Sequence, residues 1–532
     1  MSPISYLSTR GADTDLSFEQ VVLKGLASDG GLYIPSTIPT PPSDFLEAWS
    51  DLSFEALAVE IMSLYIPEVE ISRSELQDLV KRSYSTFRVD ERTPIKSLGL
   101  EDESQYLLEL FHGPTFAFKD VALQFLGNLF EFFLSRKNAK LSKDEKRHHL
   151  TVIGATSGDT GSAAIYGLRG KKDIDVFILF PTGRVSPIQE AQMTSVPDEN
   201  VHCVSVEGTF DDCQDIVKSL FNDPEFSTKF SLGAVNSINW ARILAQITYY
   251  YHSYFAILRQ TNKSPSQIKV RYSVPTGNFG DILAGYYASR MGLPIETLCV
   301  ATNENDILDR FFNSGTYSKK PLSPTDAKGG LKEDGAKAHE EGAKETLSPA
   351  MDILVSSNFE RLLWYLALQN ETRSQDPVEA SKILDSWMSS LKTSGQMSVS
   401  AASLKASKGL FKSRRVSDSE TISTIKQVYT SSKTKEIVDP HTAVGVHASL
   451  SLPSLANSVT ITLATAHPAK FSNAVDMALS EFQAQGYNFE QDVLPAEFKG
   501  LLDAEKRVTL VKGRGEGRSK VMDYVSGLHD KK

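Results

Sequence analysis

Lys119 stands at a place in the chain where its amine could attack a carbonyl. Residues 112–120 are HGPTFAFKD; the apolar stretch from Tyr106 to Phe111 predicts a buried strand before them, and the periodicity from Val121 to Leu134 predicts a helix after them. A buried lysine at a helix start loses hydration and meets the positive end of the helix dipole, and both effects lower its pKa below about 10.4. The resulting neutral amine can form a Schiff base. The alternative is an ordinary lysine that extends into solvent.

Two glycine-rich turns also follow predicted strands and precede predicted helices. Residues 154–162 are GATSGDTGS, and residues 275–281 are PTGNFGD. Such turns expose several backbone N–H groups at a helix N-terminus, which suits an anion. Neither turn contains GxGxxG or a P-loop lysine, and glycines also serve tight turns in any doubly wound fold. Taken with Lys119, the two turns indicate one site for an aldehyde cofactor, the phosphate of that cofactor and an anionic substrate.

These motifs resemble the threonine synthase family, in the subgroup typical of fungi and many bacteria. The match covers nearly the whole chain, in the family's order. The lysine segment corresponds at 113–115 and 118–120, the substrate loop at 156–161 and the cofactor-phosphate loop at 277–281. Further matching segments are STRG at 8–11, DGGLY at 29–33, LSPAMD at 347–352, SNFER at 357–361 and TAHPAKF at 465–471.

The resemblance implies pyridoxal 5'-phosphate as the cofactor and Lys119 as the catalytic residue that binds it covalently. The implied reaction converts O-phospho-L-homoserine and water to L-threonine and phosphate, by γ-elimination followed by β-addition, with Lys119 moving protons at Cα and Cβ. N–H groups of the second turn would hold the cofactor phosphate, and Thr465 would hydrogen-bond the pyridine nitrogen. The residues implied at that turn are Gly277, Asn278, Phe279, Gly280 and Asp281, with Asp281 capping the next helix.

The resemblance also implies a substrate site with two anion-binding parts. The α-carboxylate would be bound by Ser157, Gly158, Asp159 and Thr160, and the substrate phosphate by Asn236, Ser237 and Arg242. An arginine offers a planar fork for phosphate oxygens, and a helix-start ion pair is the alternative for Arg242. Many relatives in the wider fold family carry Asn in place of Asp159, and an ionised carboxylate would repel a substrate carboxylate. Asp159 and His467 therefore stay open between a catalytic and a structural role.

Alternating strand-like and helix-like segments through the middle of the chain predict an α/β fold. The βαβα order implies parallel sheets covered on both faces, with ligands at the carboxyl ends of strands. The resemblance specifies a fold type II enzyme with two doubly wound parallel-sheet domains. We expect an N-terminal helical cap domain at residues 1–91 and a catalytic region at 92–532, in which the smaller α/β domain spans about 122–232.

Two polar segments interrupt this pattern. Residues 318–346 are rich in Lys, Glu, Gly and Ala and have almost no large apolar side chains. Such a segment cannot bury enough surface to offset its ordering entropy, so a mobile insert is expected. Residues 394–419 are rich in Ser, Lys and Arg, and a solvated face with a small helical region is expected there.

Composition limits the classes of partner. Of 532 residues, 56 are Lys or Arg and 66 are Asp or Glu, and the net charge of −10 argues against nonspecific nucleic-acid binding. Cys203, Cys213 and Cys299 lack metal-type spacing and indicate reduced thiols in a cytosolic protein. No secretory signal or bilayer-spanning run is visible. We expect a cytoplasmic enzyme with a small-molecule substrate, no metal site, no nucleic-acid or membrane partner, and a monomeric or weakly oligomeric state.

Two other functions share part of this pattern. A pyridoxal-dependent serine or threonine dehydratase would have the same fold and lysine, but it would not need the phosphate site around Arg242. A noncatalytic ligand-binding relative would not need to keep Lys119 together with all three loops. Phosphate release from O-phospho-L-homoserine separates the two enzymes, and a visible absorbance band that borohydride shifts separates both from the noncatalytic relative.

Overall fold

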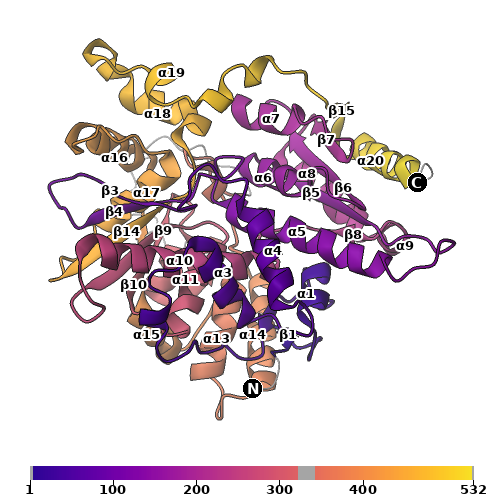
Figure 1. Ribbon diagram of the computed structural model, residues 1–532, viewed down its shortest axis with the longest axis horizontal. Coiled ribbons are helices and arrows are strands. Elements are labelled where there is room, and N and C mark those ends of the chain that lie inside the picture. The colour runs from indigo at the N-terminus through magenta and orange to yellow at the C-terminus, as the bar shows by residue number, and fades with distance from the viewer. Residues whose placement is uncertain (1–3, 321–341, 530–532) are drawn as a thin grey trace.

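The structure is a computed structural model that describes residues 4–320 and 342–529. Its two largest sheets, of five and six strands, are flanked by helices, and the long helix α5 (Lys119–Asn138) contacts helices from both units (Figure 1). The predicted α/β fold with two parallel-sheet units is confirmed. Most of the predicted polar insert, namely residues 321–341, lies outside the described ranges.

The five-stranded sheet has the order β15-β7-β6-β5-β8, and its neighbouring strands are parallel. Its strands are β5 (Leu150–Ala155), β6 (Ile174–Pro181), β7 (Val201–Val206), β8 (Leu232–Gly233) and β15 (Thr509–Val511). Its helices are α6 (Asp159–Leu168), α7 (Pro187–Thr194), α8 (Phe210–Phe221), α9 (Pro224–Lys229) and α20 (Gly513–His529). Figure 1 shows the yellow β15 beside β7. A strand from the far C-terminal part of the chain, which no sequence pattern indicated, therefore completes this sheet.

The six-stranded sheet has the order β13-β10-β9-β14-β4-β3, in which β3 and β4 are antiparallel and the other neighbours are parallel. Its strands are β3 (Ile95–Ser97), β4 (Gln105–Glu109), β9 (Lys269–Pro275), β10 (Ile295–Thr302), β13 (Phe411–Arg415) and β14 (Ser458–Ala464). Its helices include α10 (Trp240–Thr261), α11 (Gly280–Arg290), α12 (Ile307–Ser314), α16 (Asp418–Ser431) and α17 (Pro440–Leu450). Residues 270–275 of β9 are all buried, as expected for a strand covered on both faces.

The segments with predicted chemistry follow the carboxyl ends of parallel strands. β4 leads to α5 and Lys119, β5 to the first glycine turn, β9 to the second glycine turn and β14 to Thr465. The Phe118 N–H donates to the Thr465 carbonyl at 2.8 Å, so the loops after β4 and β14 are joined directly. Because β4, β14 and β9 are neighbours in one sheet, three of these loops meet at one edge.

The N-terminal region packs into the main core and contains a small sheet as well as helices. The Tyr6 ring lies 5.9 Å from the Trp240 ring, and Trp240 Nε1–H donates to the Tyr6 hydroxyl at 3.2 Å. The region therefore shares one hydrophobic cluster with α10. Its elements are β1 (Tyr6–Ser8), α1 (Phe18–Lys24), β2 (Tyr33–Pro35), α2 (Phe45–Ala48), α3 (Phe54–Ser63) and α4 (Arg73–Tyr84), with β1 and β2 antiparallel.

The polar segment 394–419 contains an edge strand. Helix α15 (Ala401–Leu410) supplies the expected helix, but β13 pairs in parallel with β10. Phe411 is buried whereas Lys412 and Arg414 are exposed, an alternation typical of a strand with one covered face. The segment is therefore more than a solvated face, because Phe411 is buried and Arg415, on the same face of the strand, is half-buried, with its Nη2 3.6 Å from Glu304 Oε1.

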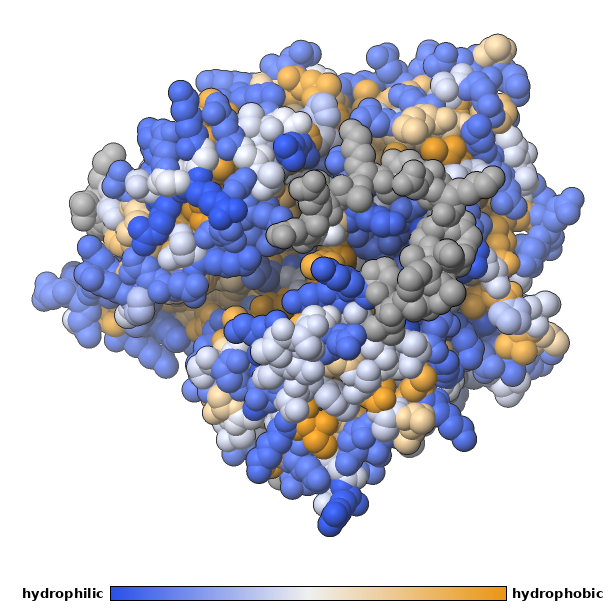
Figure 2. Space-filling view, turned by 180° about the vertical axis from the view of Figure 1, so that it is seen from behind, coloured by the Kyte–Doolittle hydropathy of each residue, from blue (hydrophilic) through white to orange (hydrophobic). Residues whose placement is uncertain are grey.

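The remaining elements connect these units. They are β11 (Thr316–Ser318), η1 (Pro349–Met351), α13 (Phe359–Asn370), α14 (Pro377–Thr393), β12 (Gln396–Ser398), η2 (Pro468–Phe471), α18 (Ser472–Leu479), η3 (Ser480–Gln485), α19 (Phe489–Asp492), η4 (Ala496–Phe498) and η5 (Leu501–Asp503). The face in Figure 2 is largely polar, with small scattered apolar patches. Among the helices of residues 4–320 and 342–529, none combines the length and apolarity that a membrane crossing requires.

Candidate active site

The segment before α5 forms a tight turn that fixes the position of Lys119. Asp120 accepts hydrogen bonds from the Thr115 backbone N–H at 2.7 Å and from the Thr115 hydroxyl at 2.8 Å. A side chain at Gly113 would overlap Asp120, since a Cβ there would lie 2.4 Å from the Asp120 Cβ. Lys119 itself is buried and is the first residue of α5, so the predicted strand-to-helix junction is confirmed.

Burial and charge together lower the pKa of the Lys119 amine. Burial is the main cause of the shift, and the nearby charges of Lys470 and Arg242 lower the pKa further. Asp159 and Asp120 oppose the shift, and Asp159 Oδ2 lies 3.7 Å from Lys119 Nζ. The direction predicted from the sequence is therefore confirmed. A lysine with a lowered pKa supplies the neutral amine that attack on a carbonyl requires.

The first glycine turn presents three of its four predicted N–H groups. The Thr156 hydroxyl accepts from the Gly158 N–H at 2.9 Å, so this N–H is used inside the turn. In the described part of the chain, the N–H groups of Ser157, Asp159 and Thr160 donate to no protein acceptor. These three groups stand at the start of α6, where the helix dipole also favours an anion.

Asp159 is held as a carboxylate by Lys470, a residue to which the sequence analysis assigned no role. Lys470 Nζ lies 2.6 Å from Asp159 Oδ1, and Gln189 Nε2 donates to the same oxygen at 2.8 Å. Burial alone would raise the pKa of the Asp159 carboxyl, but Lys470 and Lys119 hold it well below its usual range. Because Lys470 balances its charge, Asp159 does not face a substrate as a lone anion. The available signal was a lysine between apolar residues in TAHPAKF.

The second glycine turn leaves its backbone donors available. The N–H groups of Gly277, Asn278, Phe279 and Gly280 donate to no protein acceptor within the described residues. Phe279 precedes α11 with a φ of 62° and supplies no side-chain cap. At Gly277 a Cβ would lie 3.0 Å from the Ala350 carbonyl oxygen, so a larger residue would crowd the turn. Four open donors at a helix N-terminus can bind a phosphate.

Asn358 ties the second glycine turn to the loop before α10. Its backbone N–H and its Nδ2 both donate to the Asn278 carbonyl at 3.0 Å, and Nδ2 also donates to the Ser237 carbonyl at 3.2 Å. Arg361 is fully buried and donates to Asn358 Oδ1 and to the Tyr33 carbonyl. The SNFER motif thus positions two loops of the site, a role that its sequence alone did not indicate.

Asp281 does not cap α11 as expected. Its Oδ1 contacts the Tyr249 hydroxyl and lies 3.2 Å from the Tyr250 hydroxyl, while its Oδ2 is buried without a partner. Burial raises the pKa of the Asp281 carboxyl to about 7. The side chain therefore links α11 to α10, because both tyrosines belong to α10.

Arg242 is a buried arginine without an acidic partner. Its Nη1 donates to the Val235 carbonyl at 3.1 Å, and its Nε has no partner. No Asp or Glu of the described residues forms an ion pair with it, so the alternative of a helix-start ion pair is excluded. Burial lowers the pKa of Arg242 to about 10, and its charge acts on Lys119. In the preceding loop Asn236 is exposed and Ser237 is half-buried.

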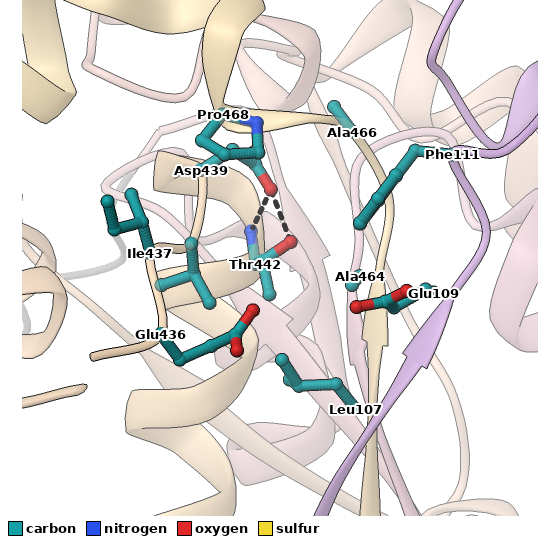
Figure 3. Close-up of a pocket in the computed structure, with 11 residues that line it drawn as sticks. Leu107, Glu109, Phe111, Glu436, Ile437, Asp439, Thr442, Ala464, Ala466 and Pro468 are labelled. Carbon is teal, nitrogen blue, oxygen red and sulfur yellow. Dashed lines mark hydrogen bonds between the residues drawn. The ribbon is translucent and has the colours of Figure 1, made fainter. Parts of the chain in front are cut away.

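Thr465 and His467 differ in whether their side chains are already hydrogen-bonded within the protein. Ala464 and Ala466 line a small cavity (Figure 3), and alternation along the extended segment places the Thr465 side chain on the opposite face. In the described ranges the Thr465 hydroxyl has no hydrogen-bond partner. His467 Nδ1 accepts from the Ala469 N–H at 3.2 Å, and burial lowers the pKa of His467 to about 4. His467 is therefore neutral and serves as a cap.

These groups fit an aldehyde cofactor that carries a phosphate. A buried amine of lowered pKa stands at the start of α5, four open N–H groups stand at the start of α11, and a free hydroxyl stands at Thr465. Within the described residues no three His, Cys, Asp or Glu side chains are grouped as metal ligands. A family model described as pyridoxal-phosphate dependent enzyme matches residues 88–342. Fold and site together define a fold type II pyridoxal-phosphate-dependent enzyme.

Comparison with known proteins gives the family. Models described as threonine synthase N terminus and threonine synthase, C-terminal match residues 5–84 and 442–525. The chain is 60% identical over 510 residues to threonine synthase of Schizosaccharomyces pombe and 54% identical over 514 residues to that of Saccharomyces cerevisiae, with 95% of each chain covered in both cases. The chain belongs to the threonine synthase family.

Solved structures agree with this assignment. The crystal structure of threonine synthase from yeast superimposes with a TM-score of 0.89 at 52% identity, and 98% of each chain is covered. A pyridoxal-phosphate-bound threonine synthase from Brucella melitensis gives a TM-score of 0.83 at 38% identity, again over 98% of each chain.

Proposed function

We propose that this chain converts O-phospho-L-homoserine and water to L-threonine and phosphate. The observation that carries the proposal is Arg242, a buried guanidinium that has no acidic partner among the described residues and is close enough to Lys119 to lower the pKa of Lys119. A buried charge that lacks a counter-ion is costly, so the site is built for an anion supplied by its ligand. A substrate that carries its own phosphate supplies that anion.

Bound pyridoxal phosphate supplies an electron sink for carbanions beside an amino-acid nitrogen. Lys119 would hold it covalently, the N–H groups of residues 277–280 would bind its phosphate, and the Thr465 hydroxyl would hydrogen-bond its pyridine nitrogen. A hydroxyl would leave that nitrogen largely unprotonated, whereas the charge of a carboxylate would favour the protonated form. Asp281 contributes as a link between α10 and α11, beside the phosphate-binding turn.

Protein groups around the substrate would bind its two anionic groups and transfer its protons. Ser157, Asp159 and Thr160 offer N–H groups to the α-carboxylate. Arg242, with Asn236 and Ser237 of the preceding loop, binds the γ-phosphate and stabilises it as it leaves. The freed Lys119 amine moves protons at Cα and Cβ, and its lowered pKa allows it both to accept and to release them near neutral pH. Water then adds at Cβ.

A dehydratase is the enzyme that this arrangement disfavours. Serine and threonine have no phosphate, so their binding would leave the buried Arg242 without a counter-ion. A noncatalytic relative is disfavoured because it has no use for a lysine of lowered pKa. Neither alternative explains Lys119 and Arg242 together.

The test compares products from two kinds of substrate with the purified, cofactor-loaded protein. Incubation with O-phospho-L-homoserine should release phosphate and form threonine in equal amounts. Incubation with serine or threonine should form at most traces of 2-oxo acid and ammonia. Rapid 2-oxo acid formation without phosphate release would establish the dehydratase, and no product from either substrate would establish the noncatalytic relative.

Further properties belong to the same proposal. We take the chain as an N-terminal cap of residues 1–91 and a catalytic region of residues 92–532, acting in the cytoplasm as a monomer or weak oligomer without nucleic-acid partners. Support comes from the three cysteines, which are free and buried as expected in a reducing compartment, and from the net charge of −10.

A further inference from the structure

Asp159 stands between two lysines at the centre of the site. Its Oδ1 lies 2.6 Å from Lys470 Nζ, and its Oδ2 lies 3.7 Å from Lys119 Nζ. The Lys470 side chain is fully buried, and its Nζ also donates to the Thr115 carbonyl at 2.9 Å. The Lys470 amine therefore lies in the protein interior, where it contacts Asp159 and Thr115, and does not reach the site from solvent.

The backbone around Lys470 holds this ammonium in place. Lys470 belongs to the 3-10 helix η2, which His467 caps by accepting from the Ala469 N–H. On its other side, Phe471 packs its ring 4.6 Å from the His441 ring. Thr115 belongs to the turn that precedes Lys119. The same turn thus contacts Lys470 and positions Lys119, so the two lysines are fixed relative to each other.

Lys119 and Lys470 differ in whether they can balance the charge of Asp159 at every step of the reaction. Lys119 gives up its proton when it binds the cofactor and takes up protons during turnover, so it cannot balance the carboxylate at every step. A buried carboxylate left without a counter-ion is strongly unfavourable. Lys470 takes no part in binding the cofactor, and its Nζ lies nearer to the Asp159 carboxylate than that of Lys119, at 2.6 Å against 3.7 Å.

We propose that Lys470 is a positioning residue that keeps Asp159 ionised and fixed in front of Lys119 throughout the reaction. This inference rests on the proposed function. The titratable and charged groups that face Lys119 are Asp120 of α5, Asp159 of α6, Arg242 of α10, Asp281 of α11 and Lys470 of η2. The charge of His441, on α17, acts on Asp159. The Asp159–Lys470 pair is thus a charge-balanced unit beside Lys119.

The test is a pH titration of the visible absorbance of the cofactor-loaded protein, which follows the nitrogen of Lys119. In Lys470→Met the charge of the Asp159 carboxylate is no longer balanced by Lys470. The carboxylate therefore favours the protonated nitrogen of Lys119, and the pH midpoint of the absorbance change should rise. Asp159→Asn leaves Lys470 unbalanced, so the midpoint should fall. Each shift should be about one pH unit or more, as expected for a unit charge a few ångströms away in a dry site. The double variant should return close to the wild-type midpoint.

Matched controls separate this effect from a general loss of packing. Lys171→Met removes a half-buried lysine that is paired with Glu131 away from the site, and it should leave the midpoint unchanged. Lys470→Arg keeps the charge and should also leave it unchanged. In the apo-protein, Lys470→Met should lower the urea midpoint of unfolding, and adding Asp159→Asn should restore most of the loss.

Two results would overturn the inference. One is a set of folded single variants whose titration midpoints stay at the wild-type value or move in the same direction. The other is a double variant that is no closer to wild type than either single variant. If Lys470→Met does not fold, the titration midpoint of Asp159→Asn is compared with that of the double variant. In the double variant, Met replaces Lys470 when no carboxylate at position 159 needs a counter-ion, so this comparison still tests the inference. Phosphate release by the wild-type protein is scored separately, so failure of the proposed function is distinguishable from failure of this pairing.

Discussion

Gly127 of α5 and Gly167 of α6 contact each other through their backbones. A Cβ on Gly127 would lie only 1.9 Å from the Gly167 carbonyl oxygen. Each glycine stands eight residues after the first residue of its helix, and those first residues are Lys119 and Asp159. The close approach of the two helices therefore brings their N-termini together and sets the 3.7 Å separation of Lys119 Nζ and Asp159 Oδ2.

Replacing Gly127 by Ala should push α5 and α6 apart, because the contact is between backbones and no flexible side chain can yield. We expect a loss of about 1–3 kcal/mol in the free energy of unfolding, as for overpacked cores, and a fall in turnover as Lys119 moves from Asp159. Urea unfolding and phosphate release measure the two effects. Gly409→Ala, in the open helix α15, is the control and should be neutral or slightly stabilising. Wild-type stability of Gly127→Ala would contradict the close approach.

Lys119→Ala should abolish covalent cofactor binding and leave the protein folded. Folding should survive because Lys470 still balances the charge of Asp159. Turnover should fall by several orders of magnitude, since each acid–base step contributes about 10²–10⁴-fold. Mass spectrometry after borohydride reduction should place the pyridoxyl group of the wild-type protein on Lys119. A pyridoxyl group on Lys470, the other lysine beside Asp159, would refute the assignment.

Arg242→Ala should keep bound pyridoxal phosphate but lose turnover of O-phospho-L-homoserine. A charge-assisted hydrogen bond contributes about 1.5–3 kcal/mol, and Arg242→Lys should rescue only in part because an ammonium lacks the planar fork. Binding of serine, followed by the change in cofactor absorbance, should be little affected. Arg271→Ala is a matched control, because Arg271 is also buried with a free Nε and a carbonyl acceptor. Equal weakening of serine and phosphohomoserine binding would contradict a phosphate-specific role.

Asp281 should be a neutral carboxylic acid below pH 7. The Tyr249 hydroxyl has one proton but contacts two acceptors, Asp281 Oδ1 and Gln246 Oε1, the latter at 3.0 Å. A protonated Asp281 resolves this conflict, because it can donate to Tyr249, which then donates to Gln246. Burial, which raises the pKa of Asp281 to about 7, favours the same state.

The pH dependence of stability tests that state. Between the ordinary pKa of about 3.8 and the native pKa of about 7, the folded protein keeps a proton on Asp281 that the unfolded chain releases. The stabilisation is therefore complete at low pH and is lost as pH rises toward 7, by about 1.4 kcal/mol per unit. Asp281→Asn should remove this slope. The unfolding free energy of the wild type minus that of the variant should therefore fall from pH 5 to 7 and then stay constant. A pH-independent difference would show that Asp281 is ionised.

Local patterns predicted the elements that carry the chemistry. The junction at Lys119 and the two glycine turns were evident because strands and helices of a parallel fold have strong apolar periodicity and short connecting turns. The edge strand β13 escaped detection because Lys412 and Arg414 lie on its exposed face. The short strand β15 was not predicted because its partner β7 lies far away in the sequence, with Thr509 paired to Val204.

The sequence by itself determined which residues stand at the starts of α5, α6 and α11, and therefore that an amine and two sets of open N–H groups exist. Only the tertiary structure decided the charges around them. Lys470 forms an ion pair with Asp159, and the Tyr249 hydroxyl hydrogen-bonds the carboxyl of Asp281. Within the part of the chain that the structure describes, Arg242 has no acidic partner. The physical reason is that burial and pairing set the state of an ionisable group, and its partners come from helices and loops remote in sequence, which local periodicity does not report.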